Sequence, residues 1–224
     1  MKVVPAAVFF EAIARRYDRA YALGSGATKE RMARVLAALP PSPAGVLDLG
    51  VGTGRELSAL QDAGYAPTGV DASEAMLAVC ARRGRPVPLV RADLWEALPF
   101  ADGSFDACIA LHGTLAHPPS RDAYATLACE VARVVRPGGA FVAEMPSRAW
   151  LARIDVVPSE TGRVAKTGED TCVHEDDALG FAVEVVVPSD ETWRETFGPW
   201  FAVTVTPLGA SETLVTGVRS LVPA

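Results

Sequence analysis

The sequence VLDLGVGTG, residues 46–54, decides the fold of this chain. It begins with apolar residues interrupted only by Asp48, a composition typical of a short strand that is buried on both faces. Gly50, Gly52 and Gly54 follow, and glycines at this spacing allow a tight turn and let a ligand lie against bare backbone. The stretch therefore predicts a strand, a ligand-binding turn and the start of a helix.

Strands and helices are expected to alternate after this turn. The predicted strands cover residues 67–70, 87–90, 105–111 and 140–145, and the predicted helices cover residues 55–63, 74–82 and 121–135. Such alternation predicts a parallel, doubly wound α/β sheet with helices on both faces. In such a sheet the glycine turn lies at the carboxyl end of the first strand, where ligands bind.

The two ends of the chain have a different pattern. Residues 1–43 are expected to form a helical cap on the same domain, with one helix over residues 8–21 and a second for which Thr28 is a candidate N-cap. In the last third we expect strands at residues 180–187, 201–207 and 214–220, and a short helix at residues 190–197. Residues 208–213 leave no room for a crossover helix, so the last two strands must pair antiparallel.

The composition is that of an ordinary globular protein. The chain has 224 residues, of which 50% are hydrophobic, and its net charge is −6, which fits one α/β domain. It has neither a basic stripe for nucleic-acid phosphates nor an apolar run of the roughly 20 residues that a membrane span needs. A modified base reached through a small basic patch stays open. The four cysteines lack metal-ligand spacing. We therefore expect a cytoplasmic monomer or homodimer that binds no nucleic acid, membrane or metal.

Three aspartates suit a ligand of the nucleoside type. Asp48 suits an ammonium group better than phosphates, and the GxGxG spacing after it differs from the GxGxxG of dinucleotide-binding turns. Asp71 ends the second predicted strand, about 20 residues after the turn, where a carboxylate can accept hydrogen bonds from both ribose hydroxyls. Asp93 follows the third strand and could accept from an exocyclic amine, with Leu94 packing on the ring and Met76 covering a purine face.

Four motifs occur in order along the chain: VLDLGVGTG, GVDAS, RADLWEALPFADGSFDACIALHGTLAH and EVARVVRPGGAFVAEM. Together they resemble the class I methyltransferase family, and they are most similar to its small-molecule branch, which includes the ubiquinone and menaquinone biosynthesis methyltransferases. The resemblance covers roughly residues 8–147. It implies S-adenosylmethionine as cofactor and in-line methyl transfer to a small-molecule acceptor. It also implies a Rossmann-like sheet of order 3-2-1-4-5-7-6 with strand seven antiparallel, and an acceptor-binding insertion at about residues 148–187 of a domain spanning residues 44–224.

The resemblance further implies which residues hold the cofactor. The three glycines of the turn would lie against its methionine part, Asp71 on the ribose and Asp93 near the adenine amine. Tyr17, Leu111 and His112 would border the sulfonium. The full expected set is Tyr17, Asp48, Gly50, Val51, Gly52, Gly54, Asp71, Ala72, Ser73, Met76, Ala92, Asp93, Leu94, Leu111 and His112.

A catalytic residue is not obligatory in this chemistry, because the thioether leaving group is neutral and a base is needed only when the acceptor must lose a proton. His112, His117 and Tyr17 are the weak candidates. A histidine here could act as a general base, since its unperturbed pKa lies near neutrality, or it could merely line the pocket or cap a turn.

Several other residues keep two interpretations. Asp71 or Ser73 could cap the following helix, and Asp93 could lie in a solvated turn. Tyr17 and Tyr21 could belong to a lid or to the core. The run His174-Glu175-Asp176-Asp177 is expected to be a solvated turn, because no further ligands at suitable spacing accompany it. The residues that could line an acceptor pocket are Arg148, Trp150, Trp193 and Trp200, with packing favoured for the last two.

Other functions are compatible with parts of this pattern. A nicotinamide-dependent oxidoreductase could use a related sheet, but the GxGxG spacing speaks against it. A non-catalytic module that binds S-adenosylmethionine or S-adenosylhomocysteine would keep the same motifs. An aminopropyltransferase would use the same fold, but it would carry an acidic segment after the fourth strand, where this chain has Leu111-His112-Gly113.

Overall fold

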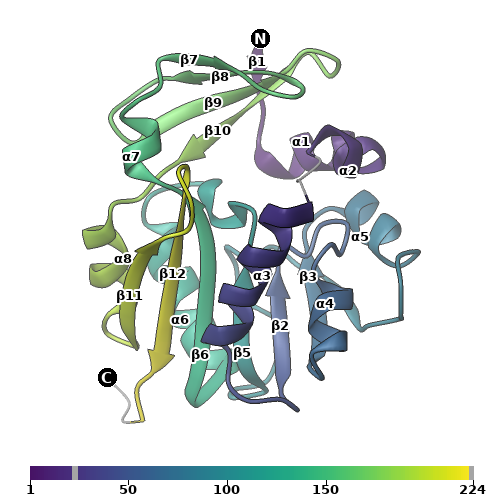
Figure 1. Ribbon diagram of the computed structural model, residues 1–224, viewed down its shortest axis with the longest axis vertical. Coiled ribbons are helices and arrows are strands. Elements are labelled where there is room, and N and C mark those ends of the chain that lie inside the picture. Colours follow the sequence, from purple (N-terminus) through teal and green to yellow (C-terminus); the bar gives the residue numbers. More distant parts are fainter. Residues whose placement is uncertain (22–24, 222–224) are drawn as a thin grey trace.

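The computed structural model describes residues 1–21 and 25–221 and, for residues 25–28, the backbone alone. Its core is a seven-stranded sheet in the order β4-β3-β2-β5-β6-β12-β11 (Figure 1). Numbered along the chain within this sheet, the order is 3-2-1-4-5-7-6. The strands are β2 (Gly45–Leu49), β3 (Ala66–Asp71), β4 (Leu89–Arg91), β5 (Phe105–Ala110), β6 (Val135–Pro146), β11 (Phe201–Pro207) and β12 (Glu212–Arg219).

The central strands are buried on both faces. β2 pairs in parallel with β3 and β5, and its successive side chains enter opposite cores: Val46 packs with the helices of one face, whereas Leu47 and Leu49 pack with those of the other. Helices α3 (Ser25–Ala38) and α4 (Leu57–Asp62) cover the first face. Helices α6 (Ala123–Val134) and α8 (Asp190–Phe197) cover the second. Helix α5 (Glu74–Cys80) packs beside β3 and β4.

The sheet ends in the expected antiparallel hairpin. β11 pairs antiparallel with β12, and β12 pairs antiparallel with β6, which confirms the interpretation drawn from the short connection between them. An aromatic cluster anchors this end, because Phe141 of β6 stacks on Phe197 of α8 with ring centroids 4.7 Å apart. Phe201 and Trp193 complete the cluster and are almost fully buried. The packing role favoured for Trp193 is therefore confirmed.

A second sheet lies over the carboxyl ends of the parallel strands (Figure 1). Helix α7 (Arg148–Leu151) leads from β6 into it. Its order is β1-β10-β9-β8-β7, with bounds β1 (Lys2–Val3), β7 (Val156–Pro158), β8 (Gly162–Lys166), β9 (Thr171–Asp176) and β10 (Phe181–Val186). β1 pairs in parallel with β10, and the other neighbours pair antiparallel. The chain therefore joins residues near position 2 to residues near position 181 in one sheet.

Three local expectations were wrong. Residues 8–21 do not form one helix, because the 3₁₀ turn η1 (Ala14–Arg16) separates α1 (Ala6–Ile13) from α2 (Tyr17–Ala20). Thr28 is not an N-cap: α3 begins at Ser25, and with no proline in residues 25–27 the helix extends toward the N-terminus. β6 begins at Val135 instead of residue 140, because the left-handed conformation of Gly138 lets the strand continue through an irregular register. No helix in the described part of the chain has the length and apolar character of a membrane span.

Candidate functional site

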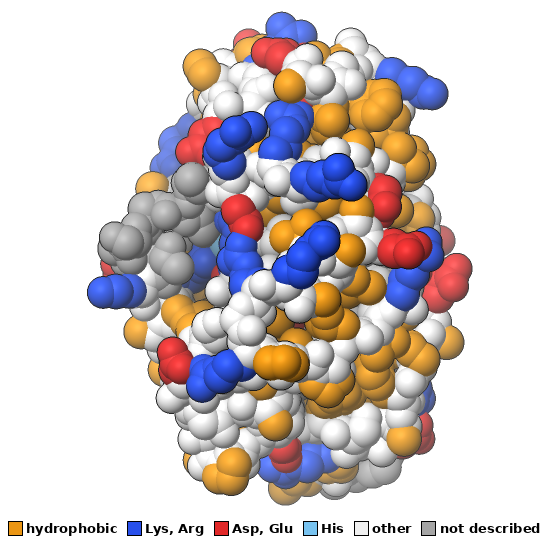
Figure 2. Space-filling model, turned by 90° about the vertical axis from the view of Figure 1, so that its right-hand side faces the viewer, with side chains coloured by type: hydrophobic (Ala, Val, Ile, Leu, Met, Phe, Trp, Pro, Cys, Tyr) orange, Lys and Arg blue, Asp and Glu red, His pale blue; other side chains and the backbone are white. Residues whose placement is uncertain are grey.

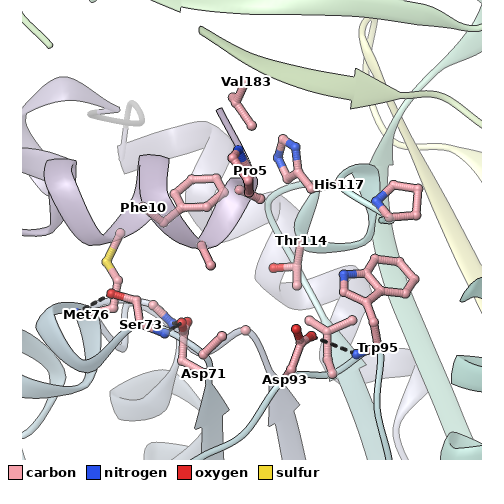
Figure 3. A pocket seen from close by; sticks show the side chains of 18 of the residues that line it. Pro5, Phe10, Asp71, Ser73, Met76, Asp93, Trp95, Thr114, His117 and Val183 are labelled. Carbon is pink, nitrogen blue, oxygen red and sulfur yellow. Dashed lines mark hydrogen bonds between the residues drawn. The ribbon is translucent and has the colours of Figure 1, made fainter. Parts of the chain in front are cut away.

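A cavity of about 580 Å³ lies between the carboxyl ends of the parallel strands and the second sheet (Figure 3). This volume is typical of a small-molecule site. One side of the cavity comes from the glycine turn and the loops after β3 and β4, and the other comes from the N-terminal segment, the loop after β5 and β10. A smaller hollow of about 30 Å³ adjoins it, because both are lined by Tyr17, Gly50, Gly52, His112 and Thr114.

Gly52 and Gly54 of the turn differ in what a side chain at each position would meet. Gly52 has a φ of +52°, and a Cβ added to it would meet nothing closer than a backbone oxygen 3.9 Å away, so it would project into open space. At Gly54, with φ +76°, a Cβ would lie 2.6 Å from the buried Sγ of Cys80. Gly52 therefore keeps room for a ligand, whereas Gly54 lets α5 pack against the turn.

Asp71 joins the glycine turn to the loop that follows β3. Its Oδ2 accepts a hydrogen bond from the Gly52 N–H at 2.8 Å, and its Oδ1 accepts one from the Ser73 N–H at 2.8 Å. Burial raises the pKa of Asp71, and these two bonds oppose the rise. Each carboxylate oxygen can accept a further bond, so Asp71 still offers acceptor capacity to the cavity that it lines.

Ser73 caps α5, because its hydroxyl accepts from the Met76 N–H at 3.0 Å. The same hydroxyl donates to the carboxylate of Glu11 on α1 at 2.6 Å, and Glu11 also accepts from the Ala75 N–H at 3.1 Å. This capping role is the alternative that the sequence had left open for Ser73. The bonds also tie the N-terminal helix to the edge of the cavity.

Asp93 orients an aromatic residue that sequence reasoning missed. Its Oδ1 accepts from the Trp95 N–H at 3.0 Å, which forms a local Asx turn. The Trp95 ring meets Tyr124 edge to face at 5.4 Å between centroids. Figure 3 shows Asp93 and Trp95 together on the same side of the cavity as Asp71.

A buried network of ionisable side chains lies next to the glycine turn. Asp48 is 3% exposed, and burial, followed by the charges of Glu56 and Asp71, holds its pKa well above the usual range. Burial would raise the pKa of Glu56 too, but its hydrogen bond with His112 and the neighbouring positive charges outweigh burial, so its pKa is lowered. Asp48 therefore favours the protonated state, whereas Glu56 is a buried carboxylate.

Both ring nitrogens of His112 are occupied by this network. Arg31 lies 3.1 Å from Nδ1 and also 3.1 Å from Nε2, and Nε2 has its shorter contact, of 2.5 Å, with Oε1 of Glu56. Because a guanidinium only donates and a carboxylate only accepts, Nδ1 accepts from Arg31 and Nε2 donates to Glu56. His112 therefore presents no ring lone pair to the cavity, which removes the observation that favoured it as a general base.

The backbone of His112 is strained. Its φ of +56° makes it the sole non-glycine residue in the left-handed region within the described chain, and Gly113 follows with φ +72°. Such a conformation costs about 1–2 kcal/mol for a residue with a Cβ. The His112 N–H donates to Oε2 of Glu144 at 3.1 Å, and this bond helps to hold the strained turn. Strain of this kind is concentrated at functional sites.

Tyr17 covers the glycine turn from the N-terminal side. The guanidinium carbon of Arg55 lies 4.7 Å from the centroid of its ring, a cation–π contact. Burial raises the pKa of Tyr17, and the Arg55 charge opposes the rise only in part. The phenol is therefore neutral and can donate a hydrogen bond, but it is a poor base.

His117 lies where three segments meet, just after the 3₁₀ turn η2 (Thr114–Ala116). Its Nδ1 lies 2.7 Å from the carbonyl oxygen of Glu184 on β10, and its ring meets Phe10 of α1 at 5.2 Å between centroids. Figure 3 shows the His117 ring with Phe10 and Val183, across the cavity from Asp71 and Asp93. Burial lowers the pKa of His117 to about 4, although the Glu184 carbonyl opposes this change.

Comparison with known proteins finds similarity to methyltransferases. Residues 46–139 match the methyltransferase domain family. The chain is 39% identical over 144 residues to the demethylmenaquinone methyltransferase of Beutenbergia cavernae, a match that covers 63% of this chain and 58% of that protein. It is 28% identical over 134 residues to the 18S rRNA (guanine-N(7))-methyltransferase of Bos taurus, covering 56% of this chain and 47% of that protein. The chain thus spans about half the length of these relatives.

The likeness in structure extends beyond the methyltransferase domain. The structure of DhpI in complex with SAH superposes with a TM-score of 0.71 at 20% identity, and the match covers 96% of this chain and 95% of that one. The Rossmann-like α/β fold that the four motifs implied is confirmed by this match. At this level of identity the likeness concerns the fold alone.

Most of the expected cofactor residues of the methyltransferase domain converge on the two hollows. Those that line the larger cavity are Tyr17, Gly50, Gly52, Asp71, Ala72, Ser73, Met76, Asp93, Leu94 and His112, and those that line only the smaller one are Asp48, Val51 and Leu111. Gly54 and Ala92 line neither: Gly54 packs against Cys80, and Ala92 donates its N–H to the Asp71 carbonyl. Their assignment as cofactor contacts is therefore not supported.

The structure differs from expectation at two places outside the four motifs: at Arg148 and Trp150, and at residues 174–177. Arg148 contacts Glu169 and the Val187 carbonyl, and Trp150 packs beside Leu151, so neither lines the described cavities. The expected solvated turn at residues 174–177 is wrong, because residues 174–176 belong to β9 and Asp176 is fully buried. Arg16 of η1 provides the reason, since it forms an ion pair with Asp176. No metal-ligand cluster occurs in the part of the chain that the structure describes.

Proposed function

We propose that this chain is a methyltransferase that transfers the methyl group of S-adenosylmethionine to a small-molecule acceptor. The observation that carries the proposal is the convergence of Gly52, Asp71 and Asp93 on one cavity of suitable volume. In the order glycine turn, second strand end and third strand end, these residues match the methionine, ribose and adenine parts of the cofactor.

The residues present fit this cofactor. The space over Gly52 that a Cβ would fill is available to a ligand in contact with the backbone. Asp71 has acceptor capacity for ribose hydroxyls, and the carboxylates of Asp71 and Asp93 suit a ligand that carries positive charge. The same fold is found in the structure of DhpI in complex with SAH.

The chain's own groups would act mainly by positioning. When bound, S-adenosylmethionine supplies a methyl group on a sulfonium, and its transfer leaves a neutral thioether. Tyr17 and His112 line both the narrow and the wide part of the cavity, and the wide part is also lined by residues of the N-terminal segment and of β10. Holding two reactants at attack distance supplies several kcal/mol toward the barrier, and a base is needed only when the acceptor must lose a proton.

A small molecule is favoured over RNA as the acceptor. The net charge of the chain is −6, and Figure 2 shows Lys and Arg side chains scattered among apolar and acidic ones on one face. Several arginines are already paired with acidic partners: Arg55 and Arg83 with Asp18, and Arg85 with Asp62. Binding to a nucleic-acid backbone needs a continuous set of uncompensated cations.

Calorimetric titration with S-adenosylhomocysteine tests the cofactor. We expect saturable binding to the wild-type protein and at least a tenfold loss, about 1.4 kcal/mol, in Asp71→Ala, because charge-assisted hydrogen bonds are removed. Asp62→Ala is the matched control, because Asp62 is an exposed aspartate on α4 that lines neither cavity.

The same titration with NAD(H) distinguishes the alternatives. Binding of NAD(H) without binding of S-adenosylhomocysteine would overturn the proposal in favour of an oxidoreductase. Turnover of labelled S-adenosylmethionine across a panel of metabolites then separates an enzyme from a module that only binds the cofactor.

A further inference from the structure

The cavity has two sides of different chemistry. The side beneath the second sheet is formed by the N-terminal segment, the loop after η2 and β10, and it is separate from the strand ends that carry Asp71 and Asp93. Its lining is mainly apolar, with Val4, Pro5, Phe10, Pro118 and Val183. An acceptor bound beside the cofactor would therefore meet an apolar surface on this side.

His117 interrupts this apolar surface with a polar atom of defined character. The Glu184 carbonyl can only accept a hydrogen bond, so the proton of a neutral His117 ring is on Nδ1. Nε2 then carries a lone pair, and no hydrogen bond from the described part of the chain reaches it. The ring is held on its other sides by Phe10 and β10, so the direction of this lone pair is fixed.

The charges around the cavity select against anions. The charged side chains in its lining are Asp71, Asp93 and Glu184, and no Lys or Arg occurs among the lining residues that the structure describes. A carboxylate or phosphate on the acceptor would therefore lose its hydration without gaining a cationic partner, which is unfavourable for a buried charge.

We propose that the acceptor is a molecule with an apolar body and no anionic group, and that its reacting hydroxyl or amine group donates a hydrogen bond to Nε2 of His117. This inference rests on the proposed methyltransferase function and adds the acceptor class and a catalytic residue to it. Of the two histidines that flank the loop, His117 is the one with a ring nitrogen available to the cavity, because both nitrogens of His112 are engaged.

The step balances in atoms and charge. The acceptor oxygen or nitrogen forms a bond to the methyl carbon, the carbon–sulfur bond breaks, and its electron pair stays on sulfur. The proton of the acceptor passes to Nε2 of His117, so the positive charge that leaves the sulfonium reappears on the imidazole. Burial disfavours the charged ring, so the proton is then released to water.

Histidine-selective ¹⁵N NMR tests the hydrogen-bonding state of His117 without any turnover. We expect a neutral ring with the proton on Nδ1 from about pH 8 down to about pH 5, whereas an unperturbed histidine would titrate near 6.5. The signal is assigned by its loss in His117→Asn. A proton on Nε2, or titration of this ring near neutrality, would overturn the assignment.

Binding of phenol and benzoate to the protein loaded with S-adenosylhomocysteine tests the acceptor class. Both probes contain one benzene ring. Phenol is neutral and can donate a hydrogen bond, whereas benzoate is an anion and cannot. We expect phenol to bind at least tenfold more tightly than benzoate and to shift the Nε2 resonance of His117. Equal or tighter binding of benzoate, or no effect of phenol on this resonance, would sink the inference.

Two substitutions separate the role in hydrogen bonding from a role in packing. His117→Asn keeps a donor for the Glu184 carbonyl but lacks an atom at Nε2, so phenol affinity should fall by about fivefold to tenfold. His117→Gln can place its amide oxygen near the Nε2 position and should restore most of that affinity. S-adenosylhomocysteine binding should stay within about twofold in both variants.

Loss of phenol binding in both variants alike would indicate that His117 acts by packing, and it would contradict the proposal. Loss of S-adenosylhomocysteine binding by the wild-type protein would instead contradict the methyltransferase function itself.

Discussion

The two sides of the cavity are built differently. The strand-end side is held by hydrogen bonds from main-chain N–H groups to Asp71 and by a packed core behind β2, β3 and β5. The second-sheet side is held by side chains from distant parts of the sequence, such as Arg16 with Asp176 and His117 with the Glu184 carbonyl.

The difference separates two tasks within one site. A side built from backbone and buried strands presents the same groups with little dependence on individual side chains, which suits a ligand common to a whole family. A side built from a separate small sheet and long-range side-chain contacts can change by substitution without disturbing the seven-stranded sheet. We therefore expect substitutions on the first side to affect cofactor binding, and substitutions on the second to affect the acceptor and the closure of the site.

The largest expected effect comes from filling the space over the glycine turn. Gly52→Ala should weaken S-adenosylhomocysteine binding by roughly a hundredfold, about 2.7 kcal/mol, because its Cβ would enter the ligand space. Gly180→Ala is the matched control: Gly180 also has a positive φ, of +69°, but lies in a turn of the second sheet with nothing near its Cβ position. Both variants should lose about 1 kcal/mol of unfolding free energy from backbone strain. Equal affinities in calorimetry would show that the ligand does not contact Gly52.

An intermediate effect is expected at the ion pair that joins η1 to β9. Arg16→Ala should lower the unfolding free energy by about 2 kcal/mol in urea titrations, because it leaves the fully buried Asp176 carboxylate without its partner. The partial exposure of Arg16 places this value below that of a wholly buried pair. The double variant Arg16→Ala/Asp176→Asn should recover at least half of the loss. S-adenosylhomocysteine affinity should change by less than about threefold, and a larger change would mean that the two sides of the cavity are not independent.

The smallest effect is expected at the contact between the two sides, where Glu11 accepts from Ser73 and Ala75. These hydrogen bonds lower the pKa of Glu11, so they stabilise the folded protein above the unfolded pKa of about 4.5 and this stability is lost as the pH falls through the lowered folded value. Glu11→Gln should cost about 0.5 kcal/mol at neutral pH, because the group is largely exposed, and progressively less at an acidic pH below the unfolded value of about 4.5. Urea titrations at both pH values test this, with Glu30→Gln on the exposed side of α3 as control. A cost that grows on acidification would contradict the assignment.

Local patterns allowed prediction of the strand-end side, but not of the second-sheet side. Asp71 and Asp93 could be found because each directly follows a short apolar run, and the carboxyl ends of parallel strands share one edge of a sheet. The role of Gly54 could not be separated from that of Gly52, because it depends on Cys80 of a later helix. Asp176 was expected in a solvated turn because its partner Arg16 lies 160 residues away in the sequence. Phe10 lies outside the four motifs, and Trp95 and Thr114 lie within the third without a pattern that marks them as cavity residues. Only the folded chain brings these three residues to the cavity.

The parallel pairing of β1 with β10 has a consequence for access to the site. The pairing involves only two residues on each strand, extended by the bond from the Val4 N–H to the Ala182 carbonyl. Few hydrogen bonds must break to separate β1 from β10, and the hydrogen bonds of the seven-stranded sheet stay intact when they do. Local opening of this pairing would detach β1 from β10, which lines the cavity. The route for exchange of acceptor and product would then open on the side that His117 faces, while the strand ends remain in place.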